Sequence, residues 1–119
     1  MRRHHDLDVW RESRRLVKRV YLLTATFPAD ERFGLTAQIR RAAVSIPSNI
    51  AEGAARSTRR DFANFVRIAR GSLSELETQI LLARDLGLCS PDSELDGELE
   101  RLFAKLNNLL RVLTREPFR

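Results

Sequence analysis

The chain has 119 residues, which is enough for one domain with a single hydrophobic core and too few for two. Its four prolines, five glycines and single cysteine favour helices over a strand-and-turn architecture and exclude an internal disulfide framework. The formal charge of +5 is uneven, because residues 1–70 carry 15 Lys/Arg against 7 Asp/Glu, whereas residues 71–119 carry 6 against 9. A local excess of positive charge attracts polyanions such as nucleic acid, an anionic membrane face or an acidic protein.

The cellular location is predicted from two features that the sequence lacks. No hydrophobic signal segment follows Met1, and no apolar run approaches the ~20 residues that span a bilayer. We therefore expect a soluble cytoplasmic protein that folds as one domain over residues 1–119. Residues 1–5 should form a loose lead-in, and because His4 and His5 have no third ligand in range there, we predict no metal site.

The first helix is predicted from about Asp6 to about Thr26, with Asp6 or Asp8 supplying an acidic N-terminus. One half of its wheel should face the core: Val9, Trp10, Ser13, Leu16, Val17, Val20, Tyr21, Leu23 and Thr24. The opposite half carries five positive side chains at helical spacing, which we call the basic ladder: Arg11, Arg14, Arg15, Lys18 and Arg19. A face that is merely soluble normally mixes both signs of charge, so the ladder indicates either a polyanion-binding surface or a solvated face of arginines.

A turn is predicted at Phe27-Pro28-Ala29-Asp30, because Pro28 biases the preceding residue away from the helical region. Asp30 can then cap a second helix that begins within residues 31–34 and ends within residues 53–57. Alanine and glycine on the inner face of this helix should let another helix approach closely. That face consists of Leu35, Ile39, Ala42, Ile46, Ile50 and Gly53.

The second helix contains a proline and a regular line of polar residues. Pro47 lacks a backbone N–H and crowds the carbonyl four residues back, so we expect a kink near residues 44–47. The polar stripe, as we name it, consists of Gln38, Arg41, Ser45, Asn49 and Glu52. A structural interpretation is favoured, in which Glu52 pairs with Arg56 along the helix. Ser45 and Asn49 would satisfy backbone groups freed by the proline or would cross to a neighbouring helix.

No motif in the chain points to an enzyme or a cofactor. A glycine-rich phosphate loop, zinc-ligand spacing, a nucleophile elbow and a Glu-x-x-His di-iron pattern are all missing from the sequence. The best catalytic candidate is the polar stripe, but a serine without a histidine base and a single carboxylate make no recognised triad or acid–base pair. We therefore predict a protein that is not an enzyme and binds no cofactor.

The third helix is predicted from about Arg59 to Leu86. One narrow stripe should face the core: Phe62, Phe65, Val66, Ala69, Leu73, Leu76, Ile80 and Ala83. A second apolar set lies away from that stripe and indicates a second packing partner, such as another subunit: Ile68, Leu82 and Leu86. Three arginines between the two sets extend the basic surface: Arg60, Arg67 and Arg70.

Turn-forming residues break the chain after the third helix, at Gly87-Leu-Cys-Ser-Pro-Asp92. Cys89 lies in this break without a nearby basic residue or a second cysteine, so we expect a semi-buried structural thiol and not a nucleophile. The fourth helix, about residues 93–115, has a leucine face with Phe103 beside it: Leu95, Leu99, Leu102, Leu106, Leu109, Leu110 and Leu113. Four amphipathic helices joined by short turns pack most simply as an up-down-up-down four-helix bundle, so we predict an all-α fold.

Several separated motifs recur in the order seen in one protein family. They are Val9-Trp10, Phe27-Pro28, the run from Arg40 to Gly53, Ile68-Ala-Arg-Gly-Ser72 and Glu75-Leu-Glu77. In these motifs the chain resembles the four-helix-bundle proteins encoded in intervening sequences of bacterial large-subunit ribosomal RNA genes. The residues that match the signature run are Arg40, Arg41, Ser45, Pro47, Asn49, Glu52 and Gly53.

That family is similar in turn to the accessory variability determinant of diversity-generating retroelements, a basic, barrel-like homopentamer thought to bind nucleic acid and a reverse transcriptase. The resemblance implies a four-helix bundle and a homo-oligomer, with a pentamer favoured. It implies no catalytic residues.

Three functions stay open on the sequence: a nucleic-acid-binding oligomer, an adaptor whose basic face meets an acidic partner such as a reverse transcriptase or a ribosomal component, and an enzyme. We rank them in that order. No aromatic residue interleaves with the basic ladder along the chain, so base stacking has little support and arginine–phosphate contact is expected. The predicted contact residues for RNA or DNA are the basic ladder with Arg60, Arg67 and Arg70.

Overall fold

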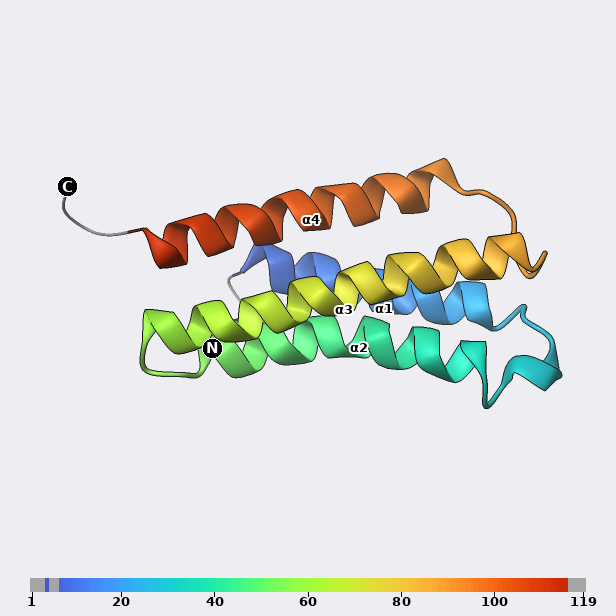
Figure 1. The fold of residues 1–119 in the computed structure, drawn as a ribbon, viewed down its shortest axis with the longest axis horizontal. Helices are drawn as coiled ribbons and strands as arrows, with labels where there is room; N and C mark the ends of the chain where they lie inside the picture. Colours follow the sequence, from blue (N-terminus) through green and yellow to red (C-terminus); the bar gives the residue numbers. More distant parts are fainter. Residues whose placement is uncertain (1–3, 5–6, 116–119) are drawn as a thin grey trace.

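The computed structural model describes His4 and residues 7–115. In these residues the chain forms four long helices, α1 (Asp8–Thr24), α2 (Leu35–Ala54), α3 (Arg59–Asp85) and α4 (Ser93–Thr114), with a short 3₁₀ helix, η2 (Ala29–Glu31), before α2. Consecutive long helices run in opposite directions (Figure 1). The described part of the chain has no strand, so the prediction of an all-α, up-down-up-down bundle is confirmed.

The four helices are arranged around one core. Helix α2 packs on α1 and α3, whereas α4 packs on α3 and, over a shorter stretch, on α1. Helices α1 and α3 therefore lie diagonally across the core, as do α2 and α4. None of the helices in the described residues is long and apolar enough to cross a membrane.

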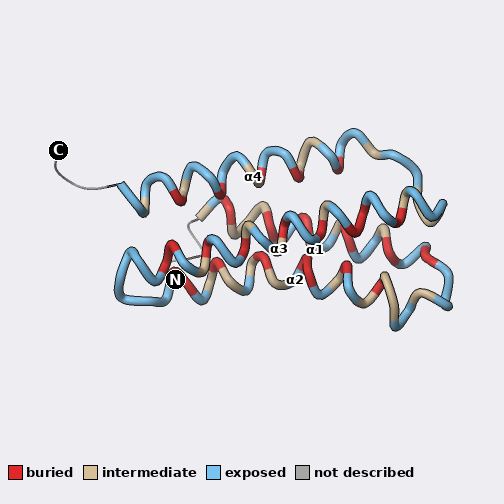
Figure 2. The backbone as a smooth tube through the Cα atoms, in the orientation of Figure 1, coloured by how far each residue is buried: buried red, intermediate tan, exposed pale blue. Residues whose placement is uncertain are grey.

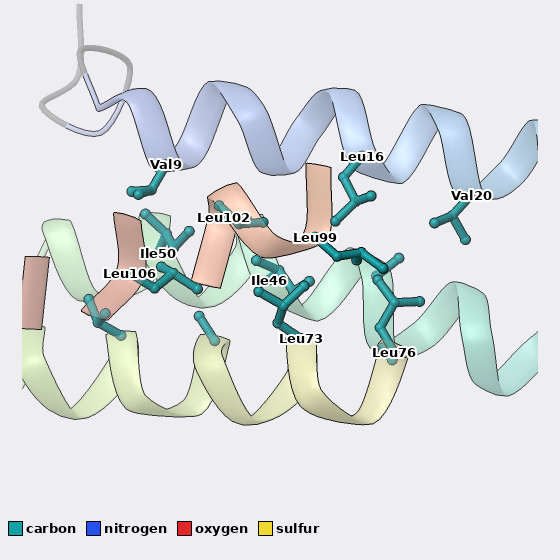
Figure 3. Packing of buried hydrophobic residues seen from close by; sticks show 14 of the residues in the cluster. Val9, Leu16, Val20, Ile46, Ile50, Leu73, Leu76, Leu99, Leu102 and Leu106 are labelled. Atoms are coloured by element: carbon teal, nitrogen blue, oxygen red, sulfur yellow. The ribbon is translucent and has the colours of Figure 1, made fainter. Parts of the chain in front are cut away.

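The core is built from the apolar stripe of each helix. Buried positions recur along the inner side of every helix, and exposed positions face outward (Figure 2). Leucine, isoleucine and valine side chains from all four helices meet there, among them Leu16, Ile46, Leu73 and Leu99 (Figure 3). Each fully buried side chain of this size contributes about 1.5–3 kcal/mol of stability by leaving water.

Side-chain caps stabilise the starts of α3 and α4. The Thr58 hydroxyl accepts a hydrogen bond from the backbone N–H of Asp61 at 3.1 Å. The Asp92 carboxylate accepts from the N–H groups of Glu94 and Leu95, each at 3.1 Å. Gly87 ends α3 with a φ of 75°, a conformation that glycine adopts readily, so the predicted break after α3 is also confirmed.

The start of α2 differs from the prediction. Asp30 does not cap it, because this residue lies inside η2 and the helix begins five residues later, at Leu35. Glu31 contributes the carboxylate instead, since its Oε1 accepts from the Leu35 N–H at 3.2 Å. Helix α1 begins at Asp8 after Leu7, and the predicted start at Asp6 lies outside the described residues.

Helix α2 approaches α3 closely at Gly53. A Cβ atom at this glycine would lie 2.7 Å from the Phe65 Cβ and 3.0 Å from the Phe62 Cδ1. The two helices can therefore come this close only because residue 53 has no side chain. The predicted close approach is therefore confirmed. The helix runs unbroken through Pro47, and the kink expected there stays a prediction.

Candidate nucleic-acid interface

The structure divides the basic ladder into two parts. Arg19 turns toward α4, where its guanidinium lies 2.8 Å from a Glu98 oxygen, 3.0 Å from an Asp92 oxygen and 3.2 Å from a Glu94 oxygen. The hydrogen bond to Asp92 is the main cause of a raised pKa for Arg19. Since three carboxylates already surround this guanidinium, it joins α1 to the start of α4 and is not offered to an external anion.

The other four ladder residues lie on the side of α1 away from the core. Arg14, Arg15 and Lys18 are exposed, and Arg11 is half-buried beside Asp8, with an N–O distance of 2.6 Å. Arg15 and Lys18 form no ion pair with any described residue. We call Arg11, Arg14, Arg15 and Lys18 the outer face of α1; together they line a shallow hollow of about 350 Å³.

The second carboxylate of α1, that of Glu12, is engaged away from this face. Glu12 is paired with the Lys105 ammonium of α4, which also lies 3.9 Å from Asp8. A larger groove of about 620 Å³ separates α1 from α4, lined by Glu12, Arg15, Leu16, Lys18, Arg19, Leu22, Glu98, Arg101 and Leu102. Arg15 and Lys18 therefore belong to the outer face of α1 and also contribute positive charge to this groove.

The three arginines predicted on α3 do not join the outer face of α1. Arg70 donates to the Asn107 Oδ1 of α4 at 3.0 Å, and Arg67 donates to the Asn64 Oδ1 at 2.9 Å. Arg60 and Arg67 line a hollow beside the end of α4. Because α1 and α3 are diagonal, α4 separates the two basic sets, and one subunit presents them as two surfaces.

Two arginine–aromatic stacks lie next to the outer face of α1 and were not predicted from the sequence. The Arg14 Cζ lies 4.8 Å from the centroid of the Trp10 ring, and the His4 ring meets the same indole edge-on. The Arg40 Cζ lies 4.4 Å from the centroid of the Tyr21 ring. The i, i+4 spacing of Trp10 and Arg14 was the signal that could have revealed the first stack. The prediction that no aromatic residue interleaves with the basic ladder is therefore wrong for the folded chain, because Trp10 stacks on Arg14.

Three residues of the polar stripe, Ser45, Asn49 and Glu52, make structural contacts, whereas Gln38 and Arg41 are exposed. The Ser45 and Ser72 hydroxyls lie 2.8 Å apart and join α2 to α3. The Asn49 amide donates to the Ser45 carbonyl at 2.8 Å and to its hydroxyl at 2.9 Å. Glu52 and Arg56 pair at 3.0 Å, as predicted. The Ser45 hydroxyl thus contacts a second hydroxyl and an amide, and neither group serves as a base for a nucleophile.

Cys89 is half-buried, as expected, but it has a basic neighbour. Burial raises the pKa of the thiol, and the nearby Arg84 guanidinium opposes this shift. The expectation that no basic residue lies near Cys89 is therefore wrong, because the turn after α3 folds back beside Arg84. A thiol with a raised pKa is a weak nucleophile at neutral pH. In the described residues no group of three His, Cys, Asp or Glu side chains could hold a metal ion, and His5 lies outside them.

The second apolar set of α3 is exposed. Ile68, Leu82 and Leu86 have 51%, 47% and 66% of their surface open to solvent. Such side chains are usually covered when they recur along one helix, so this face of α3 is a candidate contact surface.

A comparison with models of protein families gives a match. The model of a family described as 23S rRNA-intervening sequence protein matches residues 5–114. No curated protein matches the chain in sequence.

Proposed function

Because the chain belongs to the 23S rRNA-intervening sequence protein family, we propose that it is a non-enzymatic protein of the cytoplasm that binds nucleic acid. The outer face of α1 carries this proposal. Arg14, Arg15 and Lys18 are exposed, lie within about one helical turn of one another and lack a carboxylate partner among the described residues. Phosphate groups would satisfy these cations, and a cationic surface of this kind binds RNA or DNA with little sequence preference.

The α3 arginines would form a second phosphate contact. Arg60 and Arg67 are exposed, and the hydrogen-bond partners of Arg67 and Arg70 are neutral amides, so these guanidinium groups keep their full positive charge toward solvent. A nucleic acid would reach both surfaces only by crossing α4 or by contacting two subunits. The second route suits a homo-oligomer, which we propose on the exposed Ile68, Leu82 and Leu86; the resemblance to the accessory variability determinant favours a pentamer.

An adaptor function is the second candidate, and the groove between α1 and α4 favours it. This groove combines Arg15, Lys18 and Arg101 with apolar side chains, among them Leu22, which is 66% exposed. A helix with acidic and apolar residues, from a reverse transcriptase or a ribosomal component, would fit such a lining. Arg15 and Lys18 line both this groove and the outer face of α1, so the two candidates differ in what these two cations bind.

The test is the salt dependence of nucleic-acid binding. For the wild type, log affinity for a labelled RNA should fall steeply with log salt, by roughly 0.7–0.9 for each phosphate contacted. Replacing Arg14, Arg15 and Lys18 together with alanine should flatten this slope by about two to three units. Replacing Arg32, Arg41 and Arg115, which lie off α1, removes the same charge and should change the slope by less than about one unit.

We call the triple alanine variant of Arg14, Arg15 and Lys18 the α1 variant. If its salt slope equals that of the wild type, the outer face of α1 is only a solvated surface and does not bind phosphate. The adaptor function predicts a different pattern. The wild type would then bind no nucleic acid even at low salt, and the α1 variant would lose a protein partner.

A further inference from the structure

One side of α1 carries both arginine–aromatic stacks. Trp10, Arg14, Val17 and Tyr21 are spaced i, i+4, i+7 and i+11, so they follow one line along the helix. Arg40 reaches this line from α2 and stacks on Tyr21. The line borders the outer face of α1, where Arg15 and Lys18 project.

The guanidinium groups of the two stacks are held differently, since Arg40 is half-buried and Arg14 is exposed. The Arg40 Nε donates to the Thr24 hydroxyl at 2.8 Å and its Nη2 donates to the Tyr21 carbonyl at 3.3 Å, which fixes the plane against the ring. Arg14 is exposed, and Tyr21 has 41% of its surface open to solvent. Unpaired bases stack on arginine planes and on aromatic rings, so both positions can receive a base.

We propose that this side of α1 binds single-stranded nucleic acid, with bases on the Arg14–Trp10 and Arg40–Tyr21 stacks and phosphates on Arg15 and Lys18. The inference rests on the proposed function and specifies its ligand. Trp10 and Tyr21 are about 16 Å apart along the helix, at 1.5 Å per residue. A strand stacked as in a duplex, at about 3.4 Å per nucleotide, would need about five nucleotides to cover that distance, and a strand with splayed bases would need fewer. Bases in a duplex are stacked on one another and cannot occupy these positions.

The experiment uses the tryptophan itself, because Trp10 is the single tryptophan of the chain. An unstructured RNA of about ten nucleotides and the same RNA annealed to its complement are titrated into the full-length protein at one salt concentration. Binding of the single strand should quench Trp10 fluorescence and be at least about fivefold tighter than binding of the duplex. A single-stranded DNA of the same sequence should also quench, since stacking does not depend on the sugar.

Two matched substitutions separate stacking from charge. Arg14→Lys keeps the positive charge but removes the planar group, and it should weaken single-strand binding about fivefold while leaving duplex binding within about twofold. Arg15→Lys, at the neighbouring exposed position, should change neither affinity more than about twofold. Tyr21→Leu keeps an apolar side chain and should weaken single-strand binding as Arg14→Lys does.

The outcomes distinguish this inference from the proposed function. Equal affinities for both RNAs, unquenched Trp10 fluorescence or equal effects of Arg14→Lys and Arg15→Lys would overturn the stacking site. If salt-dependent binding persisted in that case, the proposed function would stand. Absence of any nucleic-acid binding at low salt would overturn both.

Discussion

Arg19 of α1 holds the carboxylate of Asp92, the residue that caps α4, at 3.0 Å. The same carboxylate accepts two backbone N–H groups of the first turn of α4, so one side chain joins a helix cap to an inter-helix ion pair. Glu98 lies on the other side of the Arg19 guanidinium at 2.8 Å. This cluster stabilises the junction between α1 and α4, the pair of neighbouring long helices with the smallest contact.

Arg19→Ala should therefore act on stability and not on nucleic-acid binding. Loss of a partly buried network of this kind costs about 1 kcal/mol, which chemical denaturation measures. The salt slope of RNA binding should stay unchanged. Arg15→Ala, four residues earlier on the same helix, should do the reverse: the slope should fall by roughly 0.7–0.9 and the stability should stay within about 0.5 kcal/mol. Equal effects of the two variants on the slope would show that Arg19 also contacts phosphate.

Acid should weaken the Asp92 cluster. The Leu95 N–H first, and then Arg19, hold the pKa of Asp92 below its ordinary value. The Asp92 carboxyl group thus binds a proton more weakly in the folded protein than in the unfolded chain. The stability that the ionised carboxylate contributes is present above the ordinary pKa of about 3.9 and is lost as the pH falls through the pKa of the folded protein. Thermal melting temperatures between pH 6 and pH 2, as approximate limits, should fall less for Asp92→Asn than for the wild type. Asparagine is a suitable control because it still caps a helix.

Close packing of α2 on α3 is tested at Gly53. Its added Cβ would meet the Cβ of Phe65, which is an inflexible part of that side chain, so the helices must separate. Gly53→Ala should lower the free energy of unfolding by ~1–3 kcal/mol through overpacking, and Gly53→Leu by no less. Gly71→Ala is the matched control, since it also lies inside a helix but has open space around its Cβ. It should raise stability by about 0.5–1 kcal/mol. A Gly53→Ala protein as stable as the wild type would contradict the close-contact argument.

The helices, the core-facing positions other than the exposed Tyr21 and the close contact at Gly53 could be predicted from sequence because each depends on spacing along one helix. The starts of α3 at Arg59 and of α4 at Ser93 were predicted at the observed residues. Asp30 misled the prediction for α2 because the chain forms a 3₁₀ turn at Ala29–Glu31 and α2 begins only after Gly34.

The separation of Arg19 from the other residues of the basic ladder could not be predicted from the sequence. The carboxylates that take Arg19 lie 73 or more residues later in the chain, and spacing along α1 does not show which side of it α4 covers. The stack of Arg40 on Tyr21 was hidden for the same reason, since it joins two helices. Features that depend on the relative rotation of two helices therefore became visible only in the assembled bundle.

The last prediction concerns the exposed apolar set of α3. If Ile68, Leu82 and Leu86 contact another copy of the chain, light scattering coupled to size exclusion should report several times 13.7 kDa at micromolar concentration. Leu82→Ser together with Leu86→Ser should reduce the measured mass to that of a smaller species, because burial of each leucine contributes about 1.5–3 kcal/mol to association. Val112→Ser on α4 is the control, since Val112 is 46% exposed and lies on another helix. The set has no role in assembly if the wild type is a monomer, or if the double variant keeps the wild-type mass.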